Sequence, residues 1–109
     1  MSTGTQGQLS GQVAFVTGGG SGLGAAFARR LAADGATVIV NDISADAASA
    51  VAIELDGDTA VFDVCDSAAF DAEVDKAVER HGRLDIMINN AGIAPPADPV
   101  RTQLAVENQ

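Results

Sequence analysis

Three glycines and the residues around them are the part of this sequence whose types and spacing could bind a phosphate group. Gly18, Gly22 and Gly24 lie between a short apolar run and an amphipathic helical pattern. In such a turn, unpaired backbone N–H groups and the positive end of the helix dipole face an anion. We expect Gly18 to turn the chain, Gly22 to let the backbone approach a phosphate, and Gly24 to let the helix pack closely on the strand. A flexible loop between a strand and a helix is the alternative interpretation.

An acidic residue at a suitable distance supports the phosphate hypothesis. Asp42 follows the apolar run Ala36–Asn41 and comes about twenty residues after the glycines. A carboxylate at the end of a second strand can accept hydrogen bonds from the ribose hydroxyls of a dinucleotide. The sequence therefore predicts a dinucleotide whose pyrophosphate lies over the helix N-terminus and whose ribose lies at Asp42.

The elements that must position these residues alternate regularly between strands and helices. Helical spacing predicts helices over Ala25–Asp34, from the N-cap Ser44 to the stop at Asp56-Gly57, and from Ser67 to the stop at His81-Gly82. Apolar runs predict strands at Val13–Val16, Ala36–Asn41, Thr59–Phe62 and Leu84–Ile88. The alternation predicts an α/β fold of the Rossmann type, with a doubly wound parallel sheet in the order 3-2-1-4.

Composition excludes several classes of partner. Fifteen Asp and Glu against six Lys and Arg give a formal net charge of -9, which disfavours nucleic acids and anionic membranes as partners. No apolar run has the length of a membrane span. A single cysteine, Cys65, cannot form an internal disulfide, and we expect a reducing cytoplasm. We assign no metal ligands.

Four motifs in order resemble those of the short-chain dehydrogenase/reductase family. They are Thr17-Gly18-x-x-x-Gly22-x-Gly24, the acidic Asp42, Asp63-Val64 after the third strand, and Asn89-Asn90-Ala91-Gly92 after the fourth. The resemblance covers about residues 9–93. It implies a Rossmann-type oxidoreductase that transfers a hydride between a nicotinamide cofactor and an alcohol or carbonyl.

The resemblance also implies roles for individual residues. Ser21 and Leu23 would contact the pyrophosphate region, Asp63 would accept from the adenine amino group, and the Val64 backbone would contact the ring. Asn90, Ala91 and Gly92 would line the riboses, while Thr17 would brace the turn. The implied cofactor contacts are Gly18, Ser21, Gly22, Leu23, Gly24, Asp42, Asp63, Val64, Asn90, Ala91 and Gly92.

Structural interpretations of the same residues remain open. Asp42 could cap the segment at Ser44, Asp63 could end a strand in a turn, and the Asn-Asn-Ala-Gly segment could be a turn stabilised by its asparagines. If Asp42 does bind the ribose, NAD is the expected cofactor. No basic residue stands in the glycine turn or directly after Asp42 to neutralise the extra phosphate of NADP.

The family's acid/base residues are missing from this chain. The family uses a Tyr with a Lys four residues later, and this chain has no Tyr and one lysine, Lys76, on the polar side of the third helix. We assign no catalytic residue, including Asn108 and the lone His81, which we expect to be exposed at a helix end. The chain alone should be inactive. A non-catalytic nucleotide-binding or partner-binding module is the alternative function; Thr17 and the Asn-Asn-Ala-Gly segment argue against a Rossmann methyltransferase.

The predicted organisation is a single half-domain with two flanking segments. We expect a disordered tail over residues 1–9, an NAD-binding Rossmann half-domain over 10–93, and a proline-rich loop with the start of a truncated helix over 94–109. Truncation, a split gene or a premature stop would account for this, and an alcohol or carbonyl substrate is expected only of a full-length form. The fourth strand would be an exposed apolar edge, through which the chain could self-associate or pair.

Overall fold

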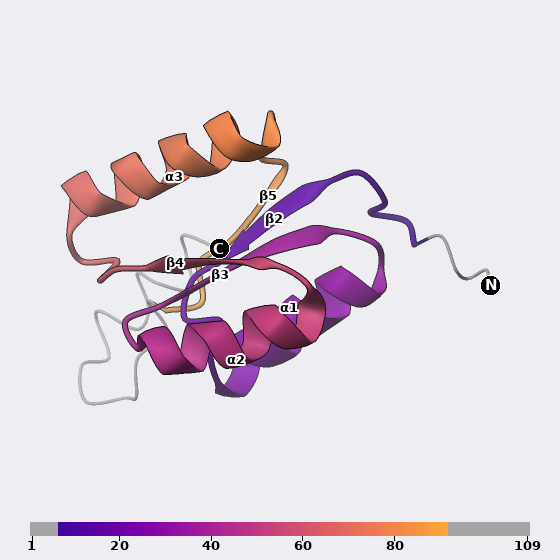
Figure 1. Ribbon diagram of the computed structural model, residues 1–109, viewed down its shortest axis with the longest axis horizontal. Helices are drawn as coiled ribbons and strands as arrows, with labels where there is room; N and C mark the ends of the chain where they lie inside the picture. The colour runs from indigo at the N-terminus through magenta and orange to yellow at the C-terminus, as the bar shows by residue number, and fades with distance from the viewer. Residues whose placement is uncertain (1–6, 92–109) are drawn as a thin grey trace.

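A four-stranded sheet lies between two layers of helix in the computed structural model, which describes residues 7–91 (Figure 1). The strands are β2 (Val13–Val16), β3 (Thr37–Asp42), β4 (Asp58–Val61) and β5 (Ile86–Ile88). The helices are α1 (Gly22–Ala33), α2 (Ala45–Leu55) and α3 (Ser67–His81). Figure 1 shows α1 and α2 on one face of the sheet and α3 on the other.

Every strand pairing in the described part of the chain is parallel, and the spatial order is β4-β3-β2-β5. In order along the chain this is 3-2-1-4, so the predicted doubly wound Rossmann topology is confirmed. The two central strands are β2 and β3, paired from Val13–Thr37 to Val16–Val40. Because all four strands run the same way, their carboxyl ends meet at one edge of the sheet, where the loops to α1, α2 and α3 begin.

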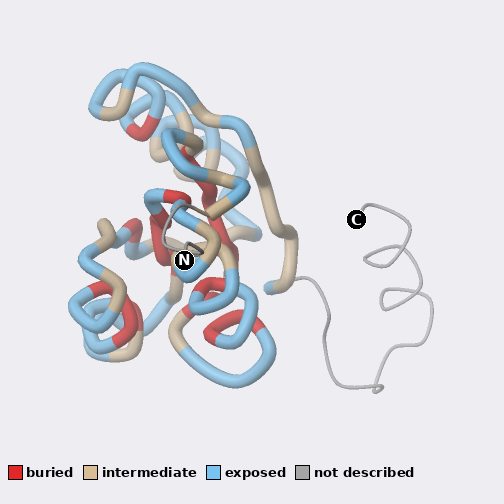
Figure 2. The backbone as a smooth tube through the Cα atoms, turned by 90° about the vertical axis from the view of Figure 1, so that its right-hand side faces the viewer, coloured by how far each residue is buried: buried red, intermediate tan, exposed pale blue. Residues whose placement is uncertain are grey.

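The core has two parts because side chains alternate across the sheet. Ala14 and Val16 of β2 pack with residues of α1 and α2, whereas Val13 and Phe15 pack with Ala77 of α3. All four β2 residues are buried, as expected for a central parallel strand, and Figure 2 shows the buried residues concentrated in the sheet and on the inner helix faces. Each fully buried Val or Phe side chain stabilises the fold by about 1.5–3 kcal/mol.

Three phenylalanines fill the space under α3. Phe15 lies 6.2 Å from Phe62 and 6.3 Å from Phe70 between ring centroids, and Phe62 meets Phe70 edge to face at 5.8 Å. Edge-to-face pairs add to the energy of burial because a positive ring edge meets a negative ring face. The cluster holds the end of β4 against the start of α3.

The fourth predicted strand begins later than the sequence suggested. We expected it from Leu84, but β5 begins at Ile86. The reason is Asp85, whose carboxylate accepts from the Val13 N–H at 2.8 Å, so a side chain takes the place of a ladder carbonyl. Hydrogen bonds from the Arg83 side chain and from the Val13 backbone lower the pKa of Asp85.

Packed structure also begins earlier than the predicted end of the N-terminal tail. Leu9 donates its N–H to the Asp34 carbonyl at 2.8 Å and packs against the core, although we expected a tail over residues 1–9. Residues 1–6, and the loop and helix start expected over 94–109, lie outside the described residues. None of the three helices between residues 7 and 91 has the length and apolar composition needed to cross a bilayer.

Candidate functional site

The glycine turn, which is residues 17–21 between β2 and α1, lies at the carboxyl edge of the sheet and is hydrogen-bonded to β3. Gly18 has a φ of 62° and donates its N–H to Asn41 Oδ1 at 3.2 Å, while Gly19 donates to the Asn41 carbonyl at 2.7 Å. A Cβ on Gly24 would overlap the Gly18 carbonyl oxygen and come within 2.6 Å of Asn90 Nδ2. Gly24 is therefore needed for the first turn of α1 to lie close to the Gly18 carbonyl, just beyond the end of β2.

Within the described part of the chain, no side chain caps the N-terminus of α1. Ser21 occupies the N-cap position with an extended backbone, and its side chain makes no capping hydrogen bond to α1. No acidic residue stands in the first turn of this helix. Gly22 has a φ of 55°, and a Cβ there would meet no atom of residues 7–91 within 4 Å. Leu23 is exposed at 57%. Within residues 7–91, the first N–H groups of α1 therefore have no side-chain cap, as the phosphate hypothesis requires.

Asp42 lies beside this turn and is held in place by backbone donors. Its Oδ2 accepts from Gly20 N at 3.1 Å and its Oδ1 accepts from Ser44 N at 3.1 Å. The capping contact at Ser44 is thus present, but each carboxylate oxygen retains further acceptor capacity. No Lys or Arg between residues 7 and 91 forms an ion pair with Asp42. The charge of Asp42 is therefore not neutralised by a cation in this part of the chain.

Gly20 keeps the space between the turn and α2 free of side chains. A Cβ there would lie 2.7 Å from Asp42 Oδ2 and 2.8 Å from Ala47 Cβ. Any larger residue at position 20 would displace the Asp42 carboxylate or α2.

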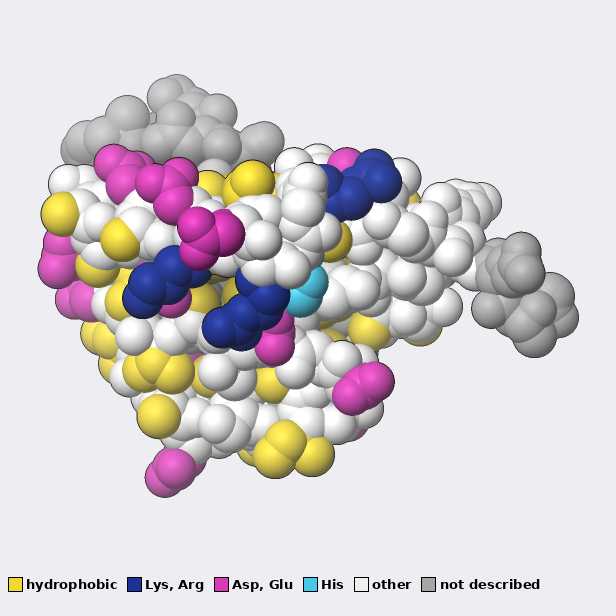
Figure 3. Space-filling view, turned by 45° about the horizontal axis from the view of Figure 1, so that its top comes forward, with side chains coloured by type: hydrophobic (Ala, Val, Ile, Leu, Met, Phe, Trp, Pro, Cys, Tyr) yellow, Lys and Arg dark blue, Asp and Glu magenta, His cyan; other side chains and the backbone are white. Residues whose placement is uncertain are grey.

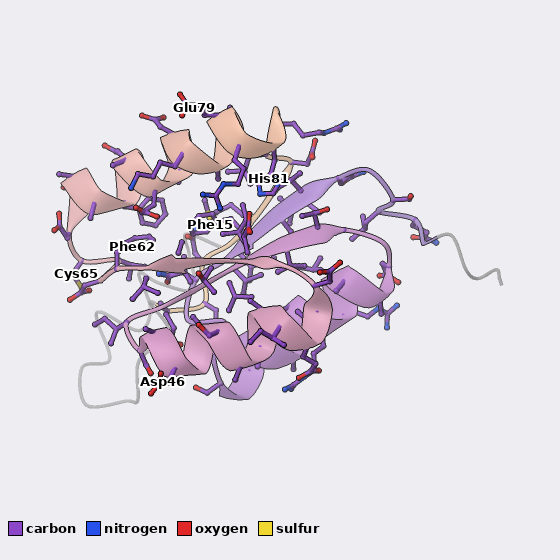
Figure 4. All side chains as sticks on the ribbon, viewed as in Figure 1. Phe15, Asp46, Phe62, Cys65, Glu79 and His81 are labelled. Atoms are coloured by element: carbon purple, nitrogen blue, oxygen red, sulfur yellow. The ribbon has the colours of Figure 1, made fainter. Side chains whose placement is uncertain are left out.

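Asp63 and Val64 follow β4 at the same edge. The Asp63 carboxylate accepts from Cys65 N at 2.9 Å, which is a turn of the kind that aspartate favours. The structural alternative for Asp63 is therefore realised, and its carboxylate is exposed. Cys65 lies at the outer end of this loop (Figure 4).

Thr17 and Asn90 join the ends of β2 and β5. Thr17 is buried, donates its hydroxyl to the Ile88 carbonyl at 3.2 Å and accepts from Ala91 N at 3.0 Å. Asn90 Nδ2 donates to the Gly18 carbonyl at 3.3 Å. Thr17 braces the turn as predicted, and Asn90 and Ala91 are brought to the glycine turn. Gly92 lies outside the described residues.

Asn41 is a site residue that the sequence analysis missed. Its side chain is 1% exposed and contacts both the glycine turn and the end of β4. The available signal was a polar side chain next to Asp42 in an otherwise apolar strand, which requires buried hydrogen-bond partners.

The other titratable groups that we considered lie away from this edge. Lys76 lies on the exposed side of α3, as predicted, and its side chain pairs with Glu73. His81 is only 19% exposed and its Nε2 lies 2.6 Å from Asp58 Oδ2, so the expectation of an exposed histidine was wrong. Figure 3 shows basic and acidic side chains beside the histidine, and Figure 4 shows His81 at the end of α3.

Asp58 is the acceptor in this second polar group. Burial alone would raise the pKa of Asp58, but hydrogen bonds from His81 and Arg80 outweigh it and lower the pKa. Asp58 is the first residue of β4, so this group lies at the opposite edge of the sheet from the glycine turn and fastens α3 to β4. Among residues 7–91, no three His, Cys, Asp or Glu side chains are grouped so that they could hold a metal ion.

Known proteins resemble this chain in sequence and in fold. The D-threitol dehydrogenase of Mycolicibacterium smegmatis is 40% identical over 103 residues, an alignment that covers 88% of this chain and 40% of that protein. A short-chain dehydrogenase of Burkholderia cenocepacia, solved in complex with NADP, superposes with a TM-score of 0.75 at 38% identity and covers 91% of this chain and 46% of its own.

A second solved structure carries the other dinucleotide. Carveol dehydrogenase of Mycobacterium avium, in complex with NAD, superposes with a TM-score of 0.73 at 36% identity, covering 80% of this chain and 38% of its own. The chain thus spans less than half the length of these three relatives. The family model for short chain dehydrogenases matches residues 12–107, most of the sequence. The chain belongs to the short-chain dehydrogenase family.

Proposed function

We propose that this chain is the NAD-binding part of a short-chain dehydrogenase. The observation that carries the proposal is the uncapped N-terminus of α1, which lies beside an aspartate whose charge no Lys or Arg of the described chain neutralises. The pyrophosphate would take the first N–H groups of α1, and Asp42 would accept from the adenosine ribose. Family membership supports this arrangement because the two solved relatives named above bind NAD or NADP.

The remaining contacts follow the path from the adenine to the nicotinamide ribose. Asp63 and the Val64 backbone would contact the adenine, while Asn90, Ala91 and Gly92 would line the riboses. The proposed cofactor contacts are Gly18, Ser21, Gly22, Leu23, Gly24, Asp42, Asp63, Val64, Asn90, Ala91 and Gly92.

The charge of Asp42 favours NAD over NADP. NADP places a phosphate where NAD has a ribose hydroxyl, and two like charges about 4 Å apart at an effective dielectric of 20 repel by about 4 kcal/mol. Solvation would leave about half of this, which is still a preference of tenfold or more. Gly20 also favours NAD, because a cationic side chain at that position would collide with Asp42 and with Ala47.

Titration of the chain with NAD and NADP tests the proposal. We expect the wild type to bind NAD at least about tenfold more tightly. Asp42→Ala and Asp42→Asn should both reduce the ratio of NAD affinity to NADP affinity. The Asn side chain keeps an acceptor oxygen for one of the two backbone donors and removes the charge. Equal affinities in the wild type, or an unchanged ratio in both variants, would show that Asp42 does not select the cofactor.

The same preparation tests what the chain does with the bound cofactor. We propose that hydride transfer between NAD(H) and an alcohol or carbonyl is the activity of a full-length protein. This chain has no Tyr, and its one lysine lies on α3 and pairs with Glu73, so it should show no turnover. Turnover of a secondary alcohol above the background of host enzymes would refute this. The lack of Tyr and the position of the single lysine fit a second candidate function equally well, a non-catalytic nucleotide- or partner-binding module. Cofactor binding without turnover in a full-length form would support this second function.

We also propose that the chain self-associates through β5. Within the described residues β5 pairs only with β2, and a hollow of about 160 Å³ lined by Phe27, Met87, Ile88 and Asn89 lies beside it. An unpaired edge strand is a template for pairing with another chain. Light scattering over a range of protein concentrations should show oligomers, and a monomer throughout would contradict the proposal.

A cytoplasmic location suits the single exposed Cys65, and cell fractionation would test it.

A further inference from the structure

The buried side chain of Asn41 connects two segments that the proposed function uses separately. Its Oδ1 accepts from Gly18 N at 3.2 Å, on the side of the glycine turn. Its Nδ2 donates to the carbonyls of Ala60 at 2.9 Å and Phe62 at 3.1 Å, on the side of β4. The backbone carbonyl of Asn41 accepts a further bond from Gly19 N.

The connection to β4 reaches the segment proposed to hold the adenine. The pairing of β3 with β4 ends at Asp42–Val61, so the Phe62 carbonyl lies one residue beyond the last pair. Asp63 and Val64 follow at once. The Asn41 amide therefore fixes the direction in which the chain leaves β4, while the Phe62 ring packs against Phe15 (Figure 4) and against Phe70.

Only an amide side chain can make all three of these bonds. A carboxylate has no donor for the two carbonyls, and a protonated carboxyl has one O–H and serves one of them at most. An aliphatic side chain serves none. No buried side-chain nitrogen or oxygen between residues 7 and 91 lacks a partner, so the network around Asn41 is complete.

We propose that Asn41 is a positioning residue that couples the glycine turn to residues 62–64, the segment that follows β4 and is called the β4 exit below. The coupling would keep the proposed pyrophosphate and adenine subsites at a fixed separation. The mechanical coupling is a property of the chain without ligand. Its effect on cofactor binding rests on the proposed function. Asn41 itself is buried beneath the turn and is not proposed to touch the cofactor.

Residue-resolved amide hydrogen exchange on the ligand-free chain tests the coupling. The informative amides are Gly18 N–H, which is bonded to Asn41, and Cys65 N–H, which is bonded to Asp63 beyond the β4 exit. Asn41→Ala should speed exchange at both amides by about tenfold. Asn41→Asp should speed it at Cys65 and leave Gly18 protected, because an acceptor for Gly18 remains.

Val51→Ala is the matched control. Val51 is buried in α2, so its truncation lowers global stability, and Val51 belongs to neither the turn nor the segment after β4. It should speed exchange evenly, with no excess at Gly18 or Cys65. If the two Asn41 variants give the same even pattern, or if Cys65 stays as protected as in the wild type, Asn41 does not couple the two segments.

Titration with ADP and NAD tests the consequence for binding. ADP carries both adenine and pyrophosphate, so both Asn41 variants should bind ADP and NAD about tenfold more weakly, whereas Val51→Ala should bind them as the wild type does once folded. A wild type that binds neither ligand would refute the proposed function while the exchange result still decides the coupling. Local exchange changes with unaltered ligand affinity would overturn the positioning role.

Discussion

The N-termini of α1 and α3 differ, although both lie at the carboxyl edge of the sheet. Each helix follows a strand, α1 after β2 and α3 after β4. At α3, Asp66 caps the helix and its carboxylate accepts from Ala69 N at 3.0 Å. At α1, Ser21 makes no side-chain cap and no acidic residue stands in the first turn.

This difference shows that a place at the sheet edge does not by itself make an anion site. The capping aspartate satisfies one N–H of α3 and puts a negative charge at the positive end of its dipole, which would repel a phosphate. The first turn of α1 is built instead from glycines, one of which allows the helix to approach the Gly18 carbonyl. The cap residue therefore distinguishes the two helix ends, and we expect the proposed phosphate at α1 and not at α3.

The largest expected effect is a loss of stability when a side chain is added at Gly24, which packs against the Gly18 carbonyl. Gly24→Ala would push a Cβ into the Gly18 carbonyl, and we expect the free energy of unfolding to fall by about 3 kcal/mol. Gly22→Ala is the control: its Cβ meets no described residue within 4 Å, and the positive φ costs only about 1 kcal/mol. Denaturant unfolding measures both, and an equal or larger loss in Gly22→Ala would contradict the packing role of Gly24.

Introducing at α1 the aspartate cap that α3 has should weaken NAD binding. Ser21→Asp would supply an acceptor for the first N–H groups and a charge beside the pyrophosphate, so NAD affinity should fall about thirtyfold, equivalent to about 2 kcal/mol. The unfolding free energy should rise or stay level. Ser21→Asn adds a cap without a charge and separates the two effects. Unchanged NAD affinity in Ser21→Asp would show that the pyrophosphate does not lie at α1.

Removing the N-terminal cap of α3 should have the smallest effect, on stability alone, and should leave NAD affinity unchanged. Asp66→Ala removes the cap, so the unfolding free energy should fall by about 1 kcal/mol. NAD affinity should stay within about twofold, because the proposed phosphate contacts are on α1. A large change in NAD affinity, measured by the same titration, would mean that the two helix ends are not independent.

Much of the candidate site was predictable because its signals are local. The spacing of Gly18, Gly22 and Gly24 and the position of Asp42 at a strand end are readable without knowing any long-range contact. The chirality of parallel crossovers then places these residues at one edge. The partners of Asn41 were not predictable in this way, since they come from residues 19 to 23 positions away in two different segments.

The sequence by itself determined the order of helices and strands, the parallel sheet and its strand order, because apolar periodicity and glycine stops specify local structure and crossover handedness limits the topology. Only the tertiary structure decided which polar atoms meet. It paired His81 with Asp58, set the Asp85 carboxylate against Val13, and placed Asn41 between the turn and β4. These contacts depend on the register and separation of neighbouring strands, which no single segment of sequence contains.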